Sequence, residues 1–282
     1  MVIEEEASLS NIDDRGLWFA EGGPPDLGQV FRACMGYART PGWAFMQGEV
    51  RNTFGSFEGL QTVELGCGLG KVSLLFSLLG ARTTLLDYSE RALCAAKFVH
   101  EQFDAHPDII NANLLHLPEK LCGRYDVAMS FGTMEHFWNA DRQCGFQSHV
   151  NVLRPGGLAI LWVPNRYGFL FHLGRSVRIL LRRPIGPIRE TSFTRRELYR
   201  RARDAGLTDI RIRGGDLLRN DFCHFIVDLR RLFGRRREYA KLFEADRLSE
   251  VLRASMETNS AKIGVLGNLF SYPLVLIGRR QR

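Results

Sequence analysis

The sequence predicts an α/β fold, a doubly wound and mostly parallel sheet of seven strands with helices on both faces. Short apolar segments alternate with helical periodicity from residue 61 onward, which is typical of parallel strands joined by crossover helices. A glycine-rich turn, GCGLG at 66–70, separates the first apolar segment from the first helical one, as in doubly wound folds. The 282 residues, 45% of them hydrophobic, suffice for one large domain with added segments.

The expected strands are short apolar runs, several of them with β-branched residues, and they are bounded by glycine, proline or polar residues. They are expected at 61–65, 82–87, 109–112, 125–131, 157–164, 208–213 and 272–278.

The expected helices show apolar residues three to four positions apart. They are expected at 27 to about 38, over PGWAFMQGEV from 41, and at 71–79, 90–103, 140–153 and 194–206. In the last of these, Thr194 is the expected N-cap, Glu197 completes a capping box and Gly206 ends the helix. Residues 221–258 also read as helical and basic. We therefore expect a helical cap over 1–55 and one domain over 56–282, with insertions at about 166–190 and 214–262.

The net charge of +7 conceals two unlike halves. Up to Asn165 there are 12 basic and 19 acidic residues, and from Arg166 onward there are 26 and 12. This contrast indicates an anionic partner for the second half, although an arginine-rich composition alone would also produce it. The six cysteines are scattered, so neither a metal site nor a disulfide framework is expected.

The N-terminal residues MVIEEEASLSNI lack the basic and apolar regions of a signal peptide. No segment reaches the roughly 18 apolar residues of a membrane span. We therefore expect a cytoplasmic protein.

Glu64, the glycine turn and Asp87 together indicate which nucleotide the turn would bind. The glycines follow a G-x-G-x-G pattern, unlike the G-x-G-x-x-G of dinucleotide sites. A carboxylate at Glu64 would repel a pyrophosphate but would attract an ammonium group. Asp87 ends the second strand, where a carboxylate can accept hydrogen bonds from ribose hydroxyls. The alternative for Asp87 is a cap on the following helix.

In these motifs the sequence resembles the class I S-adenosylmethionine-dependent methyltransferases of the small-molecule type, which have a Rossmann-like fold. The matching segments are VELGCGLG (63–70), LLDYS (85–89), NANLLHLP (111–118), YDVAMSFGTMEHF (125–137) and LRPGG (153–157). Asn113 stands where many members carry aspartate, which keeps an acceptor for the adenine amino group. The resemblance implies that S-adenosylmethionine is the cofactor and that it is bound by Glu64, Gly66, Gly68, Gly70, Asp87, Tyr88, Asn113, Leu114 and Ser130.

His136 and Glu135 are the candidate catalytic residues, because MEHF follows the fourth strand beside the expected methyl-transfer pocket. A histidine can remove a proton near neutral pH, but His136 could equally pack against a loop, and Glu135 could simply begin a helix. The [ND]-P-P-[YF] motif of amino-group methylation is absent, since Ser130, Phe131 and Gly132 occupy its place. This leaves O-methylation, with C-methylation as an alternative.

Several aromatic and basic segments leave the acceptor open. Trp18, Phe19, Trp43 and Phe45 could enclose a substrate or form core. The amphipathic segment 166–183 could rest on an anionic membrane or receive a lipid-like acceptor, or it could pack as a helix with an arginine face. Arginines at 230–237 could contact RNA, although no RNA-binding module is recognisable. The leading hypothesis is a methyltransferase for a small or lipid-like acceptor. The alternatives are an RNA methyltransferase and a non-catalytic cofactor-binding protein.

Overall fold

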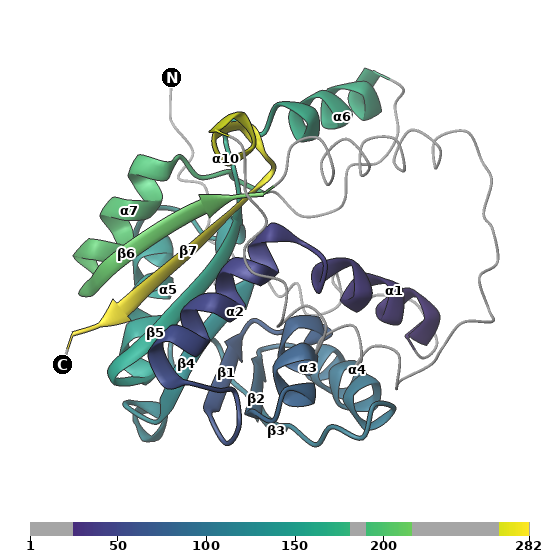
Figure 1. Ribbon diagram of the computed structural model, residues 1–282, viewed down its shortest axis with the longest axis vertical. Helices are drawn as coiled ribbons and strands as arrows, with labels where there is room; N and C mark the ends of the chain where they lie inside the picture. Colours follow the sequence, from purple (N-terminus) through teal and green to yellow (C-terminus); the bar gives the residue numbers. More distant parts are fainter. Residues whose placement is uncertain (1–24, 181–189, 216–264, 282) are drawn as a thin grey trace, which may run out of the picture.

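The computed structural model describes residues 25–180, 190–215 and 265–281, and they form a seven-stranded sheet with helices on both faces (Figure 1). The strands are β1 (Gln61–Leu65), β2 (Arg82–Asp87), β3 (Asp108–Asn111), β4 (Tyr125–Phe131), β5 (Leu153–Pro164), β6 (Leu207–Gly214) and β7 (Pro273–Arg280). Their order across the sheet is β3-β2-β1-β4-β5-β7-β6. The first five strands pair in parallel, and β7 runs antiparallel between β5 and β6. The predicted fold class is confirmed.

The helices lie close to their expected positions, except for a short one over Val265–Phe270 that was not predicted. They are α1 (Leu27–Tyr37), α2 (Pro41–Phe54), α3 (Lys71–Leu78), α4 (Glu90–Glu101), α5 (Asn139–Val152), α6 (Phe169–Leu180), α7 (Arg195–Asp204) and α10 (Val265–Phe270). At α7 the expected cap is present, since Thr194 accepts a hydrogen bond from the backbone N–H of Glu197.

The fifth strand differs most from its prediction, because it begins at Leu153 rather than Gly157. Leu153 pairs with Tyr125, and an irregularity between Tyr125 and Val127 then shifts the register. The RPGG turn lies inside this irregular stretch. Glycine and proline usually end strands, so a sequence pattern places the boundary after them.

Two apolar clusters fill the space on either side of the sheet. One cluster joins α1, α2 and α3 to alternate residues of β4, β5 and β7. The other joins α5 and α7 to the opposite face of the same strands. Figure 1 shows α6 extending from the end of β5 beyond this layered body, near α10. The arrangement leaves the turns after β1, β2, β3 and β4 together at one edge.

The two N-terminal helices belong to the core. Asp26 and Thr40 cap α1 and α2 by accepting N–H groups of Gln29 and Trp43, each at 3.0 Å. Trp43 is fully buried and meets Phe76 edge-on, with ring centroids 5.9 Å apart. Phe45 lies in the same core and packs under Arg213. For these two aromatics core packing is therefore the observed arrangement.

Some predictions fall outside the described residues. These are Trp18 and Phe19, the end of the 166–183 segment, most of the expected insertion at 214–262, and the arginines at 230–237. None of the helices in the described ranges has the length and apolar run that a bilayer crossing requires. Within the same ranges, no three histidine, cysteine, aspartate or glutamate side chains are placed to share a metal ion.

Candidate active site

The three glycines of the first turn have different surroundings, although each has a positive φ between 53° and 71°. A Cβ added to Gly66 would clash with Thr133 Cγ2, and one on Gly70 would lie 2.9 Å from His100 Nε2. A Cβ on Gly68 would meet nothing within 4 Å. Gly66 and Gly70 are therefore packed against protein, whereas Gly68 faces open space into which a ligand can approach.

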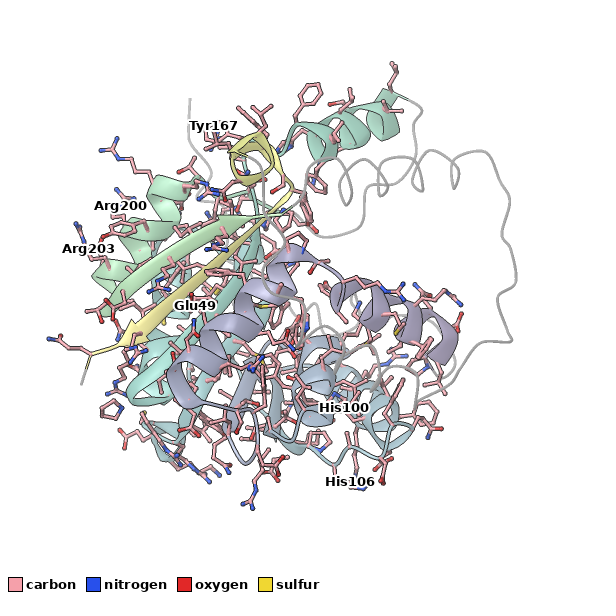
Figure 2. The ribbon with its side chains drawn as sticks, in the orientation of Figure 1. Glu49, His100, His106, Tyr167, Arg200 and Arg203 are labelled. Carbon is pink, nitrogen blue, oxygen red and sulfur yellow. The ribbon has the colours of Figure 1, made fainter. Side chains whose placement is uncertain are left out.

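Gly70 is further held by the buried His100, whose Nε2 lies 3.0 Å from the Gly70 carbonyl oxygen. Burial lowers the pKa of His100 to about 4, opposed by this hydrogen bond. A neutral imidazole can donate its Nε2–H to that carbonyl. Figure 2 labels His100 beside α3 and α4, and through this residue α4 fixes the start of α3.

Asp87 shapes the turn from the neighbouring strand. Its Oδ2 accepts the Gly68 N–H at 3.0 Å, and its Oδ1 accepts the Ser89 N–H at 2.9 Å. Ser89, not Asp87, is the N-cap of α4, because its hydroxyl accepts the N–H of Ala92. The carboxylate of Asp87 thus lies beside the one glycine of the turn that faces open space.

Glu64 is buried at the end of β1 and points toward α3. Its Oε2 accepts hydrogen bonds from the Ser73 hydroxyl at 2.6 Å and the Ser73 N–H at 3.1 Å. Burial raises the pKa of Glu64 to about 7, and the two hydrogen bonds from Ser73 oppose the rise. The carboxyl group is therefore tied to the first turn of α3, at the edge of the sheet where the glycine turn lies.

The segment after β3 lies beside the turn that follows β2. Asn111 donates its side-chain N–H to the Tyr88 carbonyl at 3.0 Å. The exposed Asn113 accepts the Leu115 N–H at 2.9 Å, and the buried Leu114 accepts the Ser148 hydroxyl at 2.6 Å through its carbonyl. The predicted adenine-side residues therefore gather between β2, β3 and α5.

The end of β4 brings a second set of polar groups to the same edge. Thr133 donates its hydroxyl to the Gly66 carbonyl at 3.0 Å, which ties the turn after β4 to the glycine turn. Ser130 is fully buried, and its hydroxyl has no hydrogen-bond partner. Glu135 and His136 follow in a short 3-10 helix, η3 (Met134–His136), and both are buried.

Glu135 is a buried carboxyl with an unpaired oxygen. The residue is 4% exposed, and its Oε2 makes no hydrogen bond. Burial raises its pKa to about 8; its own backbone N–H opposes the rise, Glu190 adds to it and Arg142 opposes it. A buried polar group without a partner is costly in a folded protein, and this oxygen is free to accept a hydrogen bond from a bound ligand.

Residues that the sequence did not single out complete this region. Tyr37, at the end of α1, has its pKa raised to about 12 by burial and by the nearby Glu64, Cys34 and Glu135. Its ring meets that of Trp162 edge-on at 5.4 Å. The end of α1 therefore lies within electrostatic reach of both buried carboxyls. The only sequence signal for this was the expected helical cap.

Residues 63–157 match the family described as a methyltransferase domain. A relative in Bordetella pertussis, named ubiquinone biosynthesis O-methyltransferase, is 28% identical over 170 residues, which are 59% of this chain and 70% of that protein. Residues 63–157 belong to a class I S-adenosylmethionine-dependent methyltransferase domain. The family match covers β1 through the start of β5, which is the part of the sheet that carries the glycine turn and Asp87.

Solved methyltransferase structures share the fold. A putative sarcosine dimethylglycine methyltransferase from Galdieria sulphuraria superposes with a TM-score of 0.54 at 15% identity, covering 84% of each chain. A magnesium protoporphyrin IX methyltransferase from Synechocystis PCC 6803, with bound S-adenosylhomocysteine, has a TM-score of 0.50 at 15% identity and covers 95% of this methyltransferase and 93% of its own chain. Likeness at this level shows a common architecture.

Proposed function

We propose that this methyltransferase transfers the methyl group to an oxygen atom of a small, lipid-like acceptor, and that Glu135 faces that acceptor. The observation that carries the proposal is the unpaired Oε2 of Glu135, a residue only 4% exposed in η3, which follows β4. An acceptor hydroxyl would supply the hydrogen bond that this carboxyl lacks, and the carboxyl would accept the hydroxyl proton.

On the donor side, we propose that the cofactor binds at the turns after β1, β2 and β3. Bound S-adenosylmethionine supplies a sulfonium-activated methyl group. The open space at Gly68 and the carboxylate of Asp87 beside it fit a ribose-bearing ligand. The residues proposed to hold it are Glu64, Gly66, Gly68, Gly70, Asp87, Tyr88, Asn113, Leu114 and Ser130. Methyl transfer then depends on positioning the acceptor and excluding water.

Two observations support oxygen as the acceptor atom. The B. pertussis relative is named an O-methyltransferase. The residues after β4 are Ser130, Phe131 and Gly132, which differ from the [ND]-P-P-[YF] sequence of amino-group methylation. His136, next to Glu135, is the second proposed base.

The decisive test is to incubate the protein with methyl-labelled cofactor and a cell extract, then identify the labelled product. A methyl ether supports the proposal and a methyl ester supports oxygen transfer without a base role for Glu135, whereas a methylated amine or RNA overturns it. Heat-treated protein and a Glu135→Gln variant are the controls.

The proposed role of Gly68 predicts different outcomes for two alanine substitutions in one turn. Both Gly66→Ala and Gly68→Ala place a side chain at positive φ, which costs about 1–2 kcal/mol. Of the two new methyl groups, only the one in Gly66→Ala also clashes with Thr133 Cγ2. We expect Gly68→Ala to fold but to bind S-adenosylmethionine weakly, and Gly66→Ala to lower the melting temperature further.

Calorimetry and thermal unfolding of both variants provide the measurements. Adding Thr133→Ser to Gly66→Ala removes the clashing methyl and should restore part of the stability. Full cofactor affinity in Gly68→Ala would show that the ligand does not approach that glycine.

A lipid-like acceptor is supported by the exposed apolar side chains of α6 and of the residues before it. Phe169 and Leu180 are 63% and 81% exposed, and Tyr167, labelled in Figure 2 beside α10, is also exposed. Arg175 on the same helix pairs with Glu190 at 3.6 Å. Apolar and basic side chains together favour an anionic membrane surface, so we propose peripheral contact through 166–183.

We therefore expect the protein to co-sediment with vesicles containing anionic phosphatidylglycerol and to be released by salt. A Phe169→Ser, Leu180→Ser variant should lose most of this binding while retaining cofactor affinity. Equal sedimentation with purely zwitterionic vesicles, or none at low salt, would exclude an anionic membrane contact.

A further inference from the structure

We propose that Arg142 is a positioning residue, which fixes the turn carrying Glu135 and His136 through Thr191 and Phe137. This inference rests on the proposed function, since it concerns the acceptor side of the same site. Arg142 lies on α5 and Thr191 lies in the segment before α7, so neither belongs to the family motifs at the end of β4.

Every nitrogen of the Arg142 guanidinium is engaged, and the residue is only 5% exposed. Nε donates to the Phe137 carbonyl at 2.8 Å, and Nη1 donates to Glu197 Oε1 at 3.0 Å. Nη2 donates to the Thr191 carbonyl at 3.1 Å and also to the Thr191 hydroxyl oxygen. One face of the guanidinium lies 3.9 Å from the centroid of the Phe193 ring.

Thr191 connects Arg142 to the turn that carries Glu135 and His136. Its N–H donates to the Glu135 carbonyl at 3.0 Å, and its hydroxyl donates to the same oxygen at 3.1 Å. The Thr191 hydroxyl thus accepts from Arg142 and donates to Glu135. Arg142 holds one end of the turn directly at Phe137 and the other end through Thr191.

The segment that carries Thr191 is itself anchored to the sheet. Phe193 N–H donates to the Pro164 carbonyl at 2.8 Å, and Arg166 N–H donates to the Phe193 carbonyl at 2.8 Å. Residues 191–193 therefore extend the end of β5 and hold the turn after β4 against it. The backbone of Glu135 is fixed by hydrogen bonds, while its Oε2 is left without one.

Burying an arginine to hold a loop carries a desolvation penalty, and apolar residues of similar volume often stabilise a fold equally well. The charge provides something an apolar group cannot. It is the cation that opposes the rise in the pKa of Glu135, against Glu190, which adds to the rise. Tyr37 on α1 is also within electrostatic reach of Glu135, and His136 is its chain neighbour. Arg142 is thus placed to fix the position of the carboxyl and to favour its charged form.

The test compares Thr191→Val, which removes the hydroxyl relay, with Thr191→Ser, which keeps it, and Arg142→Gln with Arg142→Lys. We expect Thr191→Val and Arg142→Gln to lower kcat for the labelled product by about 10-fold or more, as misplacement of a catalytic group does. KM for S-adenosylmethionine should stay unchanged, and Thr191→Ser should retain the wild-type rate. Arg154→Gln, which breaks the exposed pair with Asp126, is the matched arginine control.

A second readout does not need the acceptor. In protein labelled with ¹³C at glutamate side-chain carboxyls, the Glu135 resonance is assigned from Glu135→Gln and followed against pH. We expect its titration midpoint to move upward in Arg142→Gln and to stay unchanged in Arg154→Gln. An unchanged midpoint together with an unchanged kcat would overturn the inference. If the wild type methylated a nitrogen acceptor, the oxygen proposal would fail while this titration would still decide the role of Arg142.

Discussion

Replacing Asp87 with alanine should weaken S-adenosylmethionine binding by about 100-fold or more. The carboxylate accepts the Gly68 and Ser89 N–H groups at 3.0 and 2.9 Å, so its loss leaves two backbone donors of the turn without their partner. Hydrogen bonds to a charged group contribute about 1.5–3 kcal/mol each, and about 2.7 kcal/mol corresponds to 100-fold in affinity. Isothermal calorimetry with S-adenosylmethionine and S-adenosylhomocysteine measures the effect.

Two further variants separate the shape of the turn from contact with the ribose. Ser89→Ala removes the cap of α4 but leaves the Asp87 carboxylate, so it should lower stability with little change in affinity. Asp87→Asn keeps one acceptor oxygen for Gly68 and should have intermediate affinity. Near-normal binding by Asp87→Ala would remove Asp87 from the cofactor site.

The parts of the fold that the sequence predicts well are those that rest on local chemistry. Parallel strands buried on both faces must be short apolar runs, and β1, β2 and β4 lie at their expected bounds. Thr194 and Gly206 punctuate α7 as capping rules require. The glycine turn and Asp87 could also be placed, because the end of each strand fixes where they emerge.

The parts that the sequence could not predict depend on contacts between distant segments. Arg142 meets Thr191 across 49 positions, and His100 meets Gly70 across 30. Neither hydrophobic periodicity nor a capping pattern predicts a contact between residues so far apart in the chain. Glu64 is a related case, since its position was predicted but its bonds to Ser73 were not. Glu64 and Ser73 are nine positions apart, and they come into contact only because the glycine turn folds the start of α3 back to the end of β1.

The sequence predicted where the candidate acceptor-side residues lie, but it did not predict their burial or their hydrogen bonds. The sequence predicts that Glu135 and His136 follow β4 and that they lie near the glycine turn. Its environment includes Tyr37, near enough for the Glu135 carboxyl to raise the pKa of the tyrosine, and Thr191, whose hydroxyl donates to the Glu135 carbonyl. A functional role for Glu135 thus depends on segments more than 50 residues away on either side.

Replacing Glu135 with glutamine should lower the rate of methyl transfer by about 100-fold or more, the range of a general base. In the wild type, kcat/KM should rise with pH toward about 8, where the Glu135 carboxyl loses its proton. In Glu135→Gln this rise should disappear, while cofactor affinity should remain. His136→Asn is the companion variant, because a rise that survives in it cannot be caused by the imidazole.

The same substitution should change how stability depends on pH. Burial raises the pKa of Glu135 to about 8 from an ordinary value of 4.5, so the folded protein keeps a proton that the unfolded chain has already lost. Between these two values the folded state binds more protons, and its stability must fall as pH rises. Urea unfolding at pH 5 and pH 8 should therefore show a smaller loss for Glu135→Gln than for the wild type. Glu64 adds a loss of the same sign up to about pH 7, which both proteins share.

Parallel losses of stability in the two proteins would mean that Glu135 is already ionised at neutral pH. A rate of methyl transfer by Glu135→Gln within threefold of the wild type would remove Glu135 from the acceptor site.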